Sequence, residues 1–265
     1  MIKSQVIEYL SKHNFHPSKK MGQNFLIEEN VAKKLVSYID FKNVDVIVEV
    51  GPGLGQLTEQ LVQKNIKVIC IELDKRLSEH IKTKFLNVEL INDDILNVDL
   101  FNLLKQYKNP ILVSNLPYSI SSLMIKKFLQ QDKIKNFYCL LQKEYVNRLK
   151  ATNNNAEYNS LSALTQFYTS LNVLVDVSKN NFIPEPQVDS TFISLKKNNN
   201  KWDFSFNKFI QYCFLAKRKT LLNNLKQYYD ISKVKRWLNN KGMDVTIRAE
   251  KLTAEQLYSL YTLLK

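Results

Sequence analysis

Apolar and polar positions follow two different periods along this chain. Short apolar runs rich in Val and Ile, such as 44–50 and 110–114, predict buried β-strands, because β-branched residues pack well on a pleated sheet. Between them, apolar residues recur every three or four positions, as in 75–85, and this predicts amphipathic helices. Alternating strands and helices indicate an α/β fold with a doubly wound sheet of seven strands. The expected strands are 44–50, 67–74, 88–92, 110–114, 136–142, 171–177 and 190–196, and the expected helices are 2–13, 28–39, 75–85 and 119–131.

The pattern changes at Asn198-Asn199-Asn200, which is polar and has no apolar period. Beyond this stretch only helical periods remain, at 204–228, 231–241 and 254–264. We therefore expect an α/β domain at 1–197 and a small all-α domain at 198–265.

A glycine-rich turn follows the first predicted strand. Gly51-Pro52-Gly53-Leu54-Gly55 holds three of the chain's five glycines, and glycine lets a ligand lie against bare main chain. Glu72 follows 21 residues after Gly51, where an acid can accept hydrogen bonds from ribose hydroxyls. The spacing is not Gly-x-Gly-x-x-Gly, and Pro52 lacks an N–H for a pyrophosphate. S-adenosyl-L-methionine fits this pattern better than NAD, and an ordinary strand-turn-helix corner is the alternative to both.

Two more polar groups follow predicted strands. Asp94 comes after the third strand and Asn115 after the fourth, so we expect both at the sheet edge where open α/β folds bind ligands. The Asp94 carboxylate is placed to accept from an adenine amine, although a solvated loop acid is the simpler interpretation.

Asn115-Leu116-Pro117-Tyr118 carries the chemistry that we expect. An adenine N6 amine is a poor nucleophile because its lone pair is delocalised into the ring. Two fixed acceptors for its hydrogens turn that lone pair toward a methyl sulfonium and stabilise the developing positive charge. The Asn115 side-chain oxygen and a backbone carbonyl of the proline-stiffened turn provide these acceptors, and Tyr118 offers a ring face for the base.

Two further segments have candidate roles. The stretch 19–26, Lys-Lys-Met-Gly-Gln-Asn-Phe-Leu, combines cationic, amide and aromatic groups that can fold over a cofactor, or it is a plain linker. Phe182 lies in a proline-braced loop and can stack on the second face of a flipped base. An aromatic residue beside prolines can equally be a packing plug.

The net charge of +13 is concentrated near the C-terminus. Residues 196–265 hold 15 Lys and Arg against 5 Asp and Glu, a net +10. This distribution indicates a nucleic-acid surface, whereas the excess of 33 Lys over 5 Arg is also what compositional drift produces. We expect phosphate contacts from a cluster on one helix turn and its surroundings, with a solvated helix face as the alternative. The cluster consists of Lys217, Arg218 and Lys219 with Lys226, Lys233, Lys235 and Arg236.

Cysteine usage and hydropathy narrow the class of protein. Cys70, Cys139 and Cys213 are far apart in sequence and suggest small buried hydrophobes, neither a metal site nor a disulfide framework. No apolar run approaches 18 residues, and the first 20 residues lack a signal-type segment. We expect a soluble, cytoplasmic protein.

Taken together, the motifs resemble those of the ribosomal RNA adenine N6-dimethyltransferases, over residues 19–265. The resemblance implies a Rossmann-like class I S-adenosylmethionine-dependent methyltransferase sheet with a small all-α C-terminal domain. The matching segments are 22–26 (GQNFL), 49–59 (EVGPGLGQLTE), 71–74 (IELD), Asp94, 115–118 (NLPY), 141–144 (LQKE), 182–190 (FIPEPQVDS), 218–221 (RKTL) and 223–226 (NNLK).

The family has a housekeeping branch acting on the small ribosomal subunit and a resistance branch acting on the large one. Gly51-Pro52-Gly53, Leu116 and Val188-Asp189-Ser190 resemble the housekeeping branch. Ser119 and Asn159-Ser160 depart from the family pattern of Asn and Gly-Arg, which bears on how the neighbouring loop meets RNA. The resemblance implies a cofactor site of Asn24, Leu26, Gly51, Gly53, Glu72, Asp94 and Asn115, and a base site of Asn115, Leu116, Pro117, Tyr118 and Phe182.

The function that this resemblance implies is transfer of two methyl groups to N6 of adenines in small-subunit rRNA. It also implies a role in small-subunit biogenesis, with a pre-small-subunit particle as partner and a monomeric enzyme. A resistance-type enzyme of large-subunit rRNA is one alternative. An assembly factor whose RNA binding matters more than methylation is the other.

Overall fold

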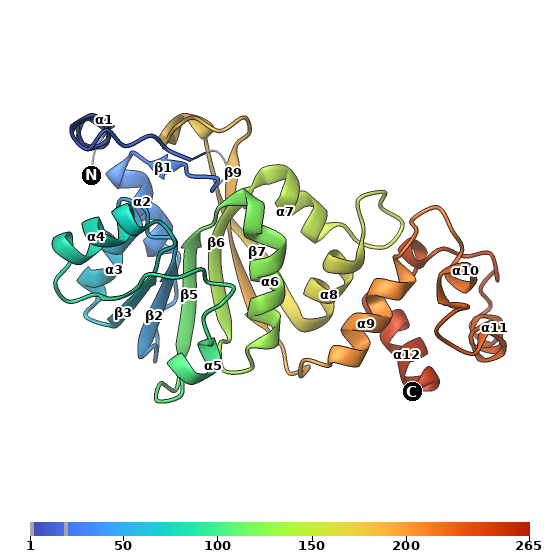
Figure 1. Cartoon of the computed structure of the whole chain (residues 1–265). Coiled ribbons are helices and arrows are strands. Elements are labelled where there is room, and N and C mark those ends of the chain that lie inside the picture. The colour runs from blue at the N-terminus through green and yellow to red at the C-terminus, as the bar shows by residue number, and fades with distance from the viewer. Residues whose placement is uncertain (1–2, 19–20) are drawn as a thin grey trace. The chain divides into compact units, whose positions relative to one another are not determined.

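The computed structural model describes residues 3–18 and 21–265 (Figure 1). The chain divides into two compact units that do not follow a single cut in the sequence. The first unit runs to Lys143 and includes Leu171–Lys197, and the second consists of Glu144–Ser170 and Asn198–Lys265. No helix in the described part of the chain has the length and apolar composition needed to cross a membrane.

The first unit contains the predicted seven-stranded sheet. Four neighbouring pairs, β4–β3, β3–β2, β2–β5 and β5–β6, are parallel, and β9 lies antiparallel to β6. The last strand in sequence, β9, lies between β6 and β7 in the sheet. Local apolar patterns do not reveal this order. In spatial order the strands are β4 (Glu89–Ile91), β3 (Lys67–Ile71), β2 (Val46–Val50), β5 (Pro110–Asn115), β6 (Asn136–Gln142), β9 (Ser190–Lys197) and β7 (Thr169–Val177).

Helices cover both faces of this sheet, as a doubly wound fold requires. Tyr138 of β6 packs in one core cluster with Leu35 and Leu57, which come from two helices on the same face. The next residue back, Phe137, points to the other face and meets Phe128, with ring centroids 5.5 Å apart. The helices of this unit are α1 (Lys3–Lys12), α2 (Glu29–Ser37), α3 (Gln56–Leu61), α4 (Lys75–Lys84), α5 (Leu100–Leu103) and α6 (Ser121–Gln130).

The segment before the sheet is not a plain linker. Residues Phe25–Leu26 form β1, which pairs antiparallel with β8 (Phe182–Ile183). Phe25 also packs in a small buried cluster with Val6 of α1 and with Leu54 of the glycine-rich turn. Lys19 and Lys20 of the predicted segment lie outside the described residues. The part that is described pairs with β8 and packs in this cluster, so it is not a plain linker, and its folding over a cofactor stays a prediction.

The second unit is helical and has an aromatic core. Phe206 and Phe209 of α9 are fully buried, and Phe206 meets Phe167 with ring centroids 4.8 Å apart. The helices are α7 (Lys143–Lys150), α8 (Ser160–Tyr168), α9 (Phe204–Cys213), α10 (Leu221–Leu225), α11 (Ile231–Asn240) and α12 (Ala254–Leu264). Neither α7 nor α8 was among the predicted elements.

The predicted single helix at 204–228 is wrong. Helix α9 ends at Cys213, and 214–220 form a turn before α10. The buried Asn224 amide donates to the carbonyls of Cys213 (2.8 Å) and Ala216 (3.2 Å), and Thr220 caps α10. These bonds hold the chain in a turn that the apolar period alone did not indicate. The predicted burial of Cys70, Cys139 and Cys213 is confirmed.

Gly55 should be the least replaceable glycine of the turn. Its φ is +83°, and an added Cβ would lie 2.5 Å from Cε2 of Phe85. We expect Gly55→Ala to lower the free energy of unfolding by about 1–3 kcal/mol more than Gly51→Ala, because only the former overpacks its surroundings. Gly51 is the matched control, with a φ of +66° and Cδ of Pro117 at 3.9 Å from the added Cβ. Urea unfolding of the two variants measures the difference, and equal losses would contradict the packing explanation.

Candidate active site

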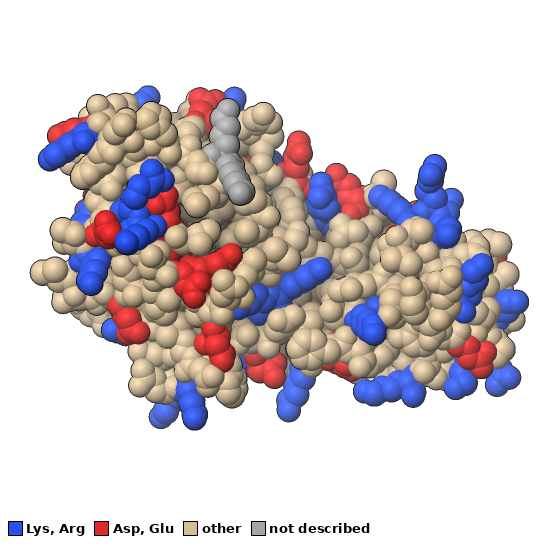
Figure 2. Space-filling view, viewed as in Figure 1, with Lys and Arg blue, Asp and Glu red and all other residues tan. Residues whose placement is uncertain are grey.

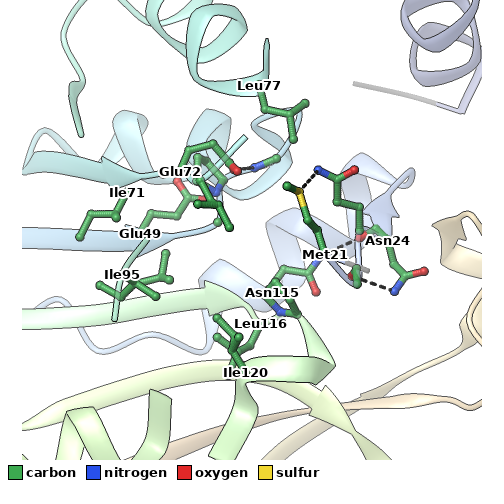
Figure 3. Close-up of a pocket in the computed structure, with 18 of the residues that line it drawn as sticks. Met21, Asn24, Glu49, Ile71, Glu72, Leu77, Ile95, Asn115, Leu116 and Ile120 are labelled. Atoms are coloured by element: carbon green, nitrogen blue, oxygen red, sulfur yellow. Dashed lines mark hydrogen bonds between the residues drawn. The ribbon is translucent and has the colours of Figure 1, made fainter. Parts of the chain in front are cut away.

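A cavity of about 400 Å³ lies in the first unit, at the carboxyl ends of four parallel strands (Figure 3). A cavity of this size suits a small organic ligand. Five separate segments converge on it, so most of the predicted site residues meet here. The wall is formed by residues 21–26, 49–53 with Gln56 and Leu57, 71–73 with Leu77, 93–95, and 115–120.

The glycine-rich turn follows β2 and brings main chain into the wall. Gly53 has a φ of +59°, which L-residues rarely adopt, and an added Cβ would lie 3.2 Å from the Phe25 ring. Its N–H donates to Oε2 of Glu72 at 3.2 Å. The turn is therefore held between the N-terminal segment on one side and the end of β3 on the other.

Glu72 has a structural role that the sequence analysis did not predict, and its ligand-binding role stays a prediction. It is 6% exposed, and its Oε1 accepts from the Asp74 N–H at 2.9 Å while Oε2 accepts from Gly53. Burial raises the pKa of Glu72, and the two backbone bonds oppose that rise. Two bonds leave acceptor capacity on the carboxylate, so it can also receive hydroxyl groups from a ligand.

Glu49 is a wall residue to which the sequence analysis gave no role. This penultimate residue of β2 is 1% exposed, and Cys70 Sγ donates to its Oε2 at 3.5 Å. Burial raises the pKa of Glu49 to about 7. The signal was present in the sequence, because an acid within an apolar run such as 46–50 has no solvent to face.

The Asn115 side chain is oriented by the N-terminal segment. Its Nδ2 donates to the carbonyl of Asn24 at 3.1 Å, and Figure 3 shows this bond as a dashed line. With the amide nitrogen engaged there, Oδ1 is the group available to the cavity. The predicted acceptor role therefore has a structural basis in a residue 91 positions away.

A second bond holds the same segment. Gln23 Nε2 donates to Oδ2 of Asp74 at 3.0 Å, and Arg76 pairs with this carboxylate at 2.7 Å. The arginine holds the pKa of Asp74 below its ordinary value, with the Gln23 bond adding to that effect against burial. Gln23 was quoted as part of a motif, but sequence reasoning gave it no partner.

Most of the remaining predicted residues lie in the cavity wall. Leu26, Asp94, Leu116, Pro117 and Tyr118 all line the cavity. The Tyr118 hydroxyl lies 2.9 Å from Oγ of Ser190, a fully buried residue at the start of β9. Asp94 Oδ1 accepts from the Leu96 N–H at 2.9 Å, which makes it an ordered loop acid.

Phe182 is the exception among the predicted base-site residues. It is 2% exposed, pairs with Leu26 across β1 and β8, and belongs to the core cluster of the sheet. It is not part of the cavity wall formed by the described residues. The ring therefore packs in the protein core, which was the alternative interpretation of this residue. Its stacking on a base stays a prediction.

The wall is acidic. Glu49, Glu72, Asp93 and Asp94 contribute to it, and the described wall contains no Lys, Arg or His. Such a wall opposes a polyphosphate and favours a neutral or cationic ligand. Across residues 3–18 and 21–265 no group of three His, Cys, Asp or Glu side chains is arranged to hold a metal ion.

The family model for ribosomal RNA adenine dimethylase matches residues 13–265. The chain belongs to this family. A relative from Ureaplasma parvum serovar 3, named ribosomal RNA small subunit methyltransferase A, is 40% identical over 275 residues, with 100% of this chain and 99% of the relative covered. A relative of the same name from Thermotoga maritima is 35% identical, with 96% and 88% covered.

Two solved structures show that the family fold is present. The dimethyladenosine transferase from Plasmodium falciparum aligns with a TM-score of 0.75 at 23% identity, covering 89% of this chain and 95% of that one. The 23S rRNA methyltransferase ErmE aligns with a TM-score of 0.66 at 20% identity, covering 91% and 99%. The predicted class I methyltransferase fold with a helical C-terminal region is thereby confirmed.

The predicted RNA-binding residues of this family member lie in its second unit, so the structure does not bring them into the cavity wall. Lys217, Arg218 and Lys219 are exposed in the turn between α9 and α10, not on a helix as expected, and Lys226 follows α10. Lys217 Nζ donates to the carbonyl of Ala156. In Figure 2, Lys and Arg side chains gather where Figure 1 draws α10 and α11.

The pKa of Glu49 makes stability depend on pH. Its folded-state pKa of about 7 lies above the ordinary value of 4.5, so the folded state holds the proton more tightly than the unfolded state. This group therefore stabilises the fold below pH 4.5, and that contribution is lost as pH rises toward 7. Relative to Glu49→Gln, we expect the wild type to lose on the order of 3 kcal/mol between pH 4.5 and 8.

Urea unfolding across this pH range measures the Glu49 effect. Glu89→Gln is the control, because Glu89 is a strand acid whose side chain is 44% exposed and paired with Lys67. Parallel pH profiles for the wild type and Glu49→Gln would show that Glu49 is ionised without penalty.

Proposed function

We propose that this protein transfers methyl groups from S-adenosyl-L-methionine to the N6 amine of adenines in small-subunit rRNA, forming N6,N6-dimethyladenine. The observation that carries the proposal is the Asn115 amide, held by Asn24 in the wall of an acidic cavity with Oδ1 available. The names of the curated relatives support the small subunit as the source of the adenine.

The cavity fits the proposed cofactor by size and charge. S-adenosylmethionine supplies, when bound, a methyl group on a positively charged sulfur that an amine can attack. An acidic wall favours that charge and disfavours the pyrophosphate of NAD. We assign ribose hydroxyls to Glu72 and the adenine amine to Asp94. The main chain at Gly51 and Gly53 and the groups of Asn24, Leu26 and Asn115 complete the proposed cofactor site.

The target adenine needs two acceptors for its amine hydrogens. Asn115 Oδ1 is the first. The Pro117 carbonyl already accepts from the Ile120 N–H at 3.2 Å, so we assign the second acceptor to the carbonyl of Leu116. With both hydrogens held, the nitrogen lone pair points at the methyl group and the developing charge is stabilised. The ring of Tyr118, whose hydroxyl is fixed by Ser190, offers the base a flat surface.

The two alternatives lose support for different reasons. The likeness to ErmE, at 20% identity, concerns the fold alone, while the curated relatives at 35–40% carry small-subunit names. An assembly factor without catalysis would not require the Asn24–Asn115 bond or an acidic cavity.

We further infer that the protein acts as a monomer on a pre-small-subunit particle in the cytoplasm and contributes to small-subunit biogenesis. In this scheme the first unit catalyses and the second unit binds rRNA, so the expected division at residue 197 is modified only by 144–170, which belong to the second unit.

The direct test maps N6,N6-dimethyladenine in the small- and large-subunit rRNAs of cells with and without this protein. The proposal requires that the modification disappears from small-subunit rRNA alone when the protein is absent. Loss from large-subunit rRNA would favour the resistance-type activity, and unchanged rRNAs would favour the assembly factor.

Asn115→Ala should separate chemistry from binding. Part of the Asn115 interaction exists only in the transition state, so we expect the methyl-transfer rate to fall by about 10²- to 10³-fold while RNA affinity stays within a few-fold. Single-turnover methylation of small-subunit particles at saturating cofactor measures the rate. Asn109→Ala is the control, because Asn109 is exposed at the opposite end of the same strand. A rate near that of the wild type would remove Asn115 from catalysis.

Neutralising Lys217, Arg218 and Lys219 together should weaken RNA binding through lost phosphate contacts. Each contact contributes slightly under one unit to the log-log dependence of affinity on salt, so we expect the slope to flatten by about two to three units. A titration of RNA binding over a range of salt concentrations measures it. Neutralising Lys42, Lys105 and Lys108, which are exposed near the amino ends of β2 and β5, is the charge-matched control. Identical slopes for both triple variants would indicate that the basic turn is not a phosphate site.

A further inference from the structure

The second unit carries a stacked tyrosine pair beside its basic turn. Tyr212 lies in the last turn of α9, and Tyr228 lies three residues past the end of α10. Their ring centroids are 3.6 Å apart and the rings are inclined by only 7°. Lys208 Nζ lies over the Tyr212 ring, 5.9 Å from its centroid. The two rings and the cation thus form one layered surface feature.

One face of this pair is open to solvent. Tyr228 is 42% exposed although Tyr212 covers one side of its ring, so the exposed area comes from the opposite side and the edge. Phe206 and Phe209 at 0% and Tyr261 at 3% are withdrawn from solvent. Phe204 at 68% and Tyr258 at 38% are also exposed, but their ring partners are inclined to them by 33° to 90°, so neither is backed by a parallel ring. A large flat ring left exposed and backed by a second ring is an arrangement that suits stacking with another aromatic group.

The turn between α9 and α10 has hydrogen bonds of its own, apart from the tyrosine pair. Asn224, which is 4% exposed, already holds that turn through its bonds to the carbonyls of Cys213 and Ala216. Tyr212 precedes the segment that these bonds close, and Tyr228 follows it. Between the two tyrosines lie Lys217, Arg218, Lys219 and Lys226.

Charge decides which aromatic partner fits this feature. Within residues 144–170 and 198–265 there are 15 Lys and Arg against 7 Asp and Glu, a net charge of +8. A polyanion that carries flat rings satisfies both the cations and the open ring. Base–aromatic stacking with neighbouring phosphate contacts is how proteins bind unpaired nucleotides without reading their sequence.

We propose that Tyr228, backed by Tyr212, is a stacking platform for an unpaired base of the RNA whose phosphates the adjacent cations bind. This inference rests on the proposed function, because it takes rRNA as the partner. It adds a contact that distinguishes unpaired from paired RNA, since a base inside a duplex has no free face to offer.

The test measures the affinity of the full chain for two RNA probes. One is a hairpin with an all-adenine single-stranded loop, and the other is the same stem as an uninterrupted duplex. For Tyr228→Leu we expect affinity for the looped hairpin to fall by about 5- to 150-fold, the range that stacking of one base supports, with duplex affinity unchanged. The salt slope should also be unchanged, because no cation is removed.

Two variants control for damage to the fold. Tyr228→Phe keeps the ring and should bind both probes as the wild type does. Tyr38→Leu removes a ring that is 39% exposed in the first unit and should have no effect. If Tyr228→Leu unfolds, ultraviolet crosslinking of the wild type to the looped hairpin replaces it, and the proposal requires a crosslink at Tyr212 or Tyr228 that the duplex does not give.

Three results would overturn the platform. Equal weakening of both probes would mean that the pair only shapes the basic turn. No change with either probe would mean that no base stacks there. A loss confined to intact ribosomal particles, with both RNA probes unaffected, would assign the pair to a protein partner.

Dimethylation of small-subunit particles by the wild type, measured in parallel, separates this inference from the proposed function. A wild type that does not dimethylate would refute the proposed function. A wild type that dimethylates while Tyr228→Leu binds both probes normally would refute the platform alone.

Discussion

The geometry of the site depends on one buried carboxylate. Glu72 joins the glycine turn to the start of α4 by accepting from the Gly53 and Asp74 N–H groups. Asp74, placed in this way, binds Gln23, and the segment that contains Gln23 carries the Asn24 carbonyl that orients Asn115. A series of short bonds therefore connects the ends of β3 and β5 through the N-terminal segment. Because each link fixes the next, the orientation of the Asn115 amide depends on residues far from it in sequence.

This arrangement concentrates negative charge where it is costly for the free protein. Burial raises the pKa of both Glu49 and Glu72, so the fold tolerates these carboxyls with a loss of stability near neutral pH. A site that binds a positively charged sulfur gains from the same charges. Strained or destabilised groups in proteins are found at functional sites for this reason. The cost falls on the free protein, and the benefit appears when a cationic ligand is bound.

The second unit differs from the first in the composition of its core and in the charge of its surface. Its core is made of aromatic rings such as Phe167, Phe206 and Phe209, and its surface carries the excess of cations. The turn after α9 presents Arg218 and Lys219 outside any helix, held in shape by the buried Asn224 amide. In the proposed function, a turn held by hydrogen bonds loses less backbone entropy when its cations bind a phosphate backbone.

The sequence by itself determined what depends on neighbours along the chain. The seven strands, the glycine turn and the helices at 231–241 and 254–264 follow from apolar periods and turn residues, and motif residues such as Glu72 and Asn115 could be named because they directly follow strands. Tertiary structure alone decided what depends on partners distant in sequence. It buried the Phe182 ring against β1, broke the expected helix at Cys213, assigned 144–170 to the second unit, and set β9 antiparallel beside β6. The Asn24–Asn115 bond spans 91 residues and the Gln23–Asp74 bond spans 51, and no local period encodes such distances. The residues of the site could therefore be predicted, whereas their orientation required the fold.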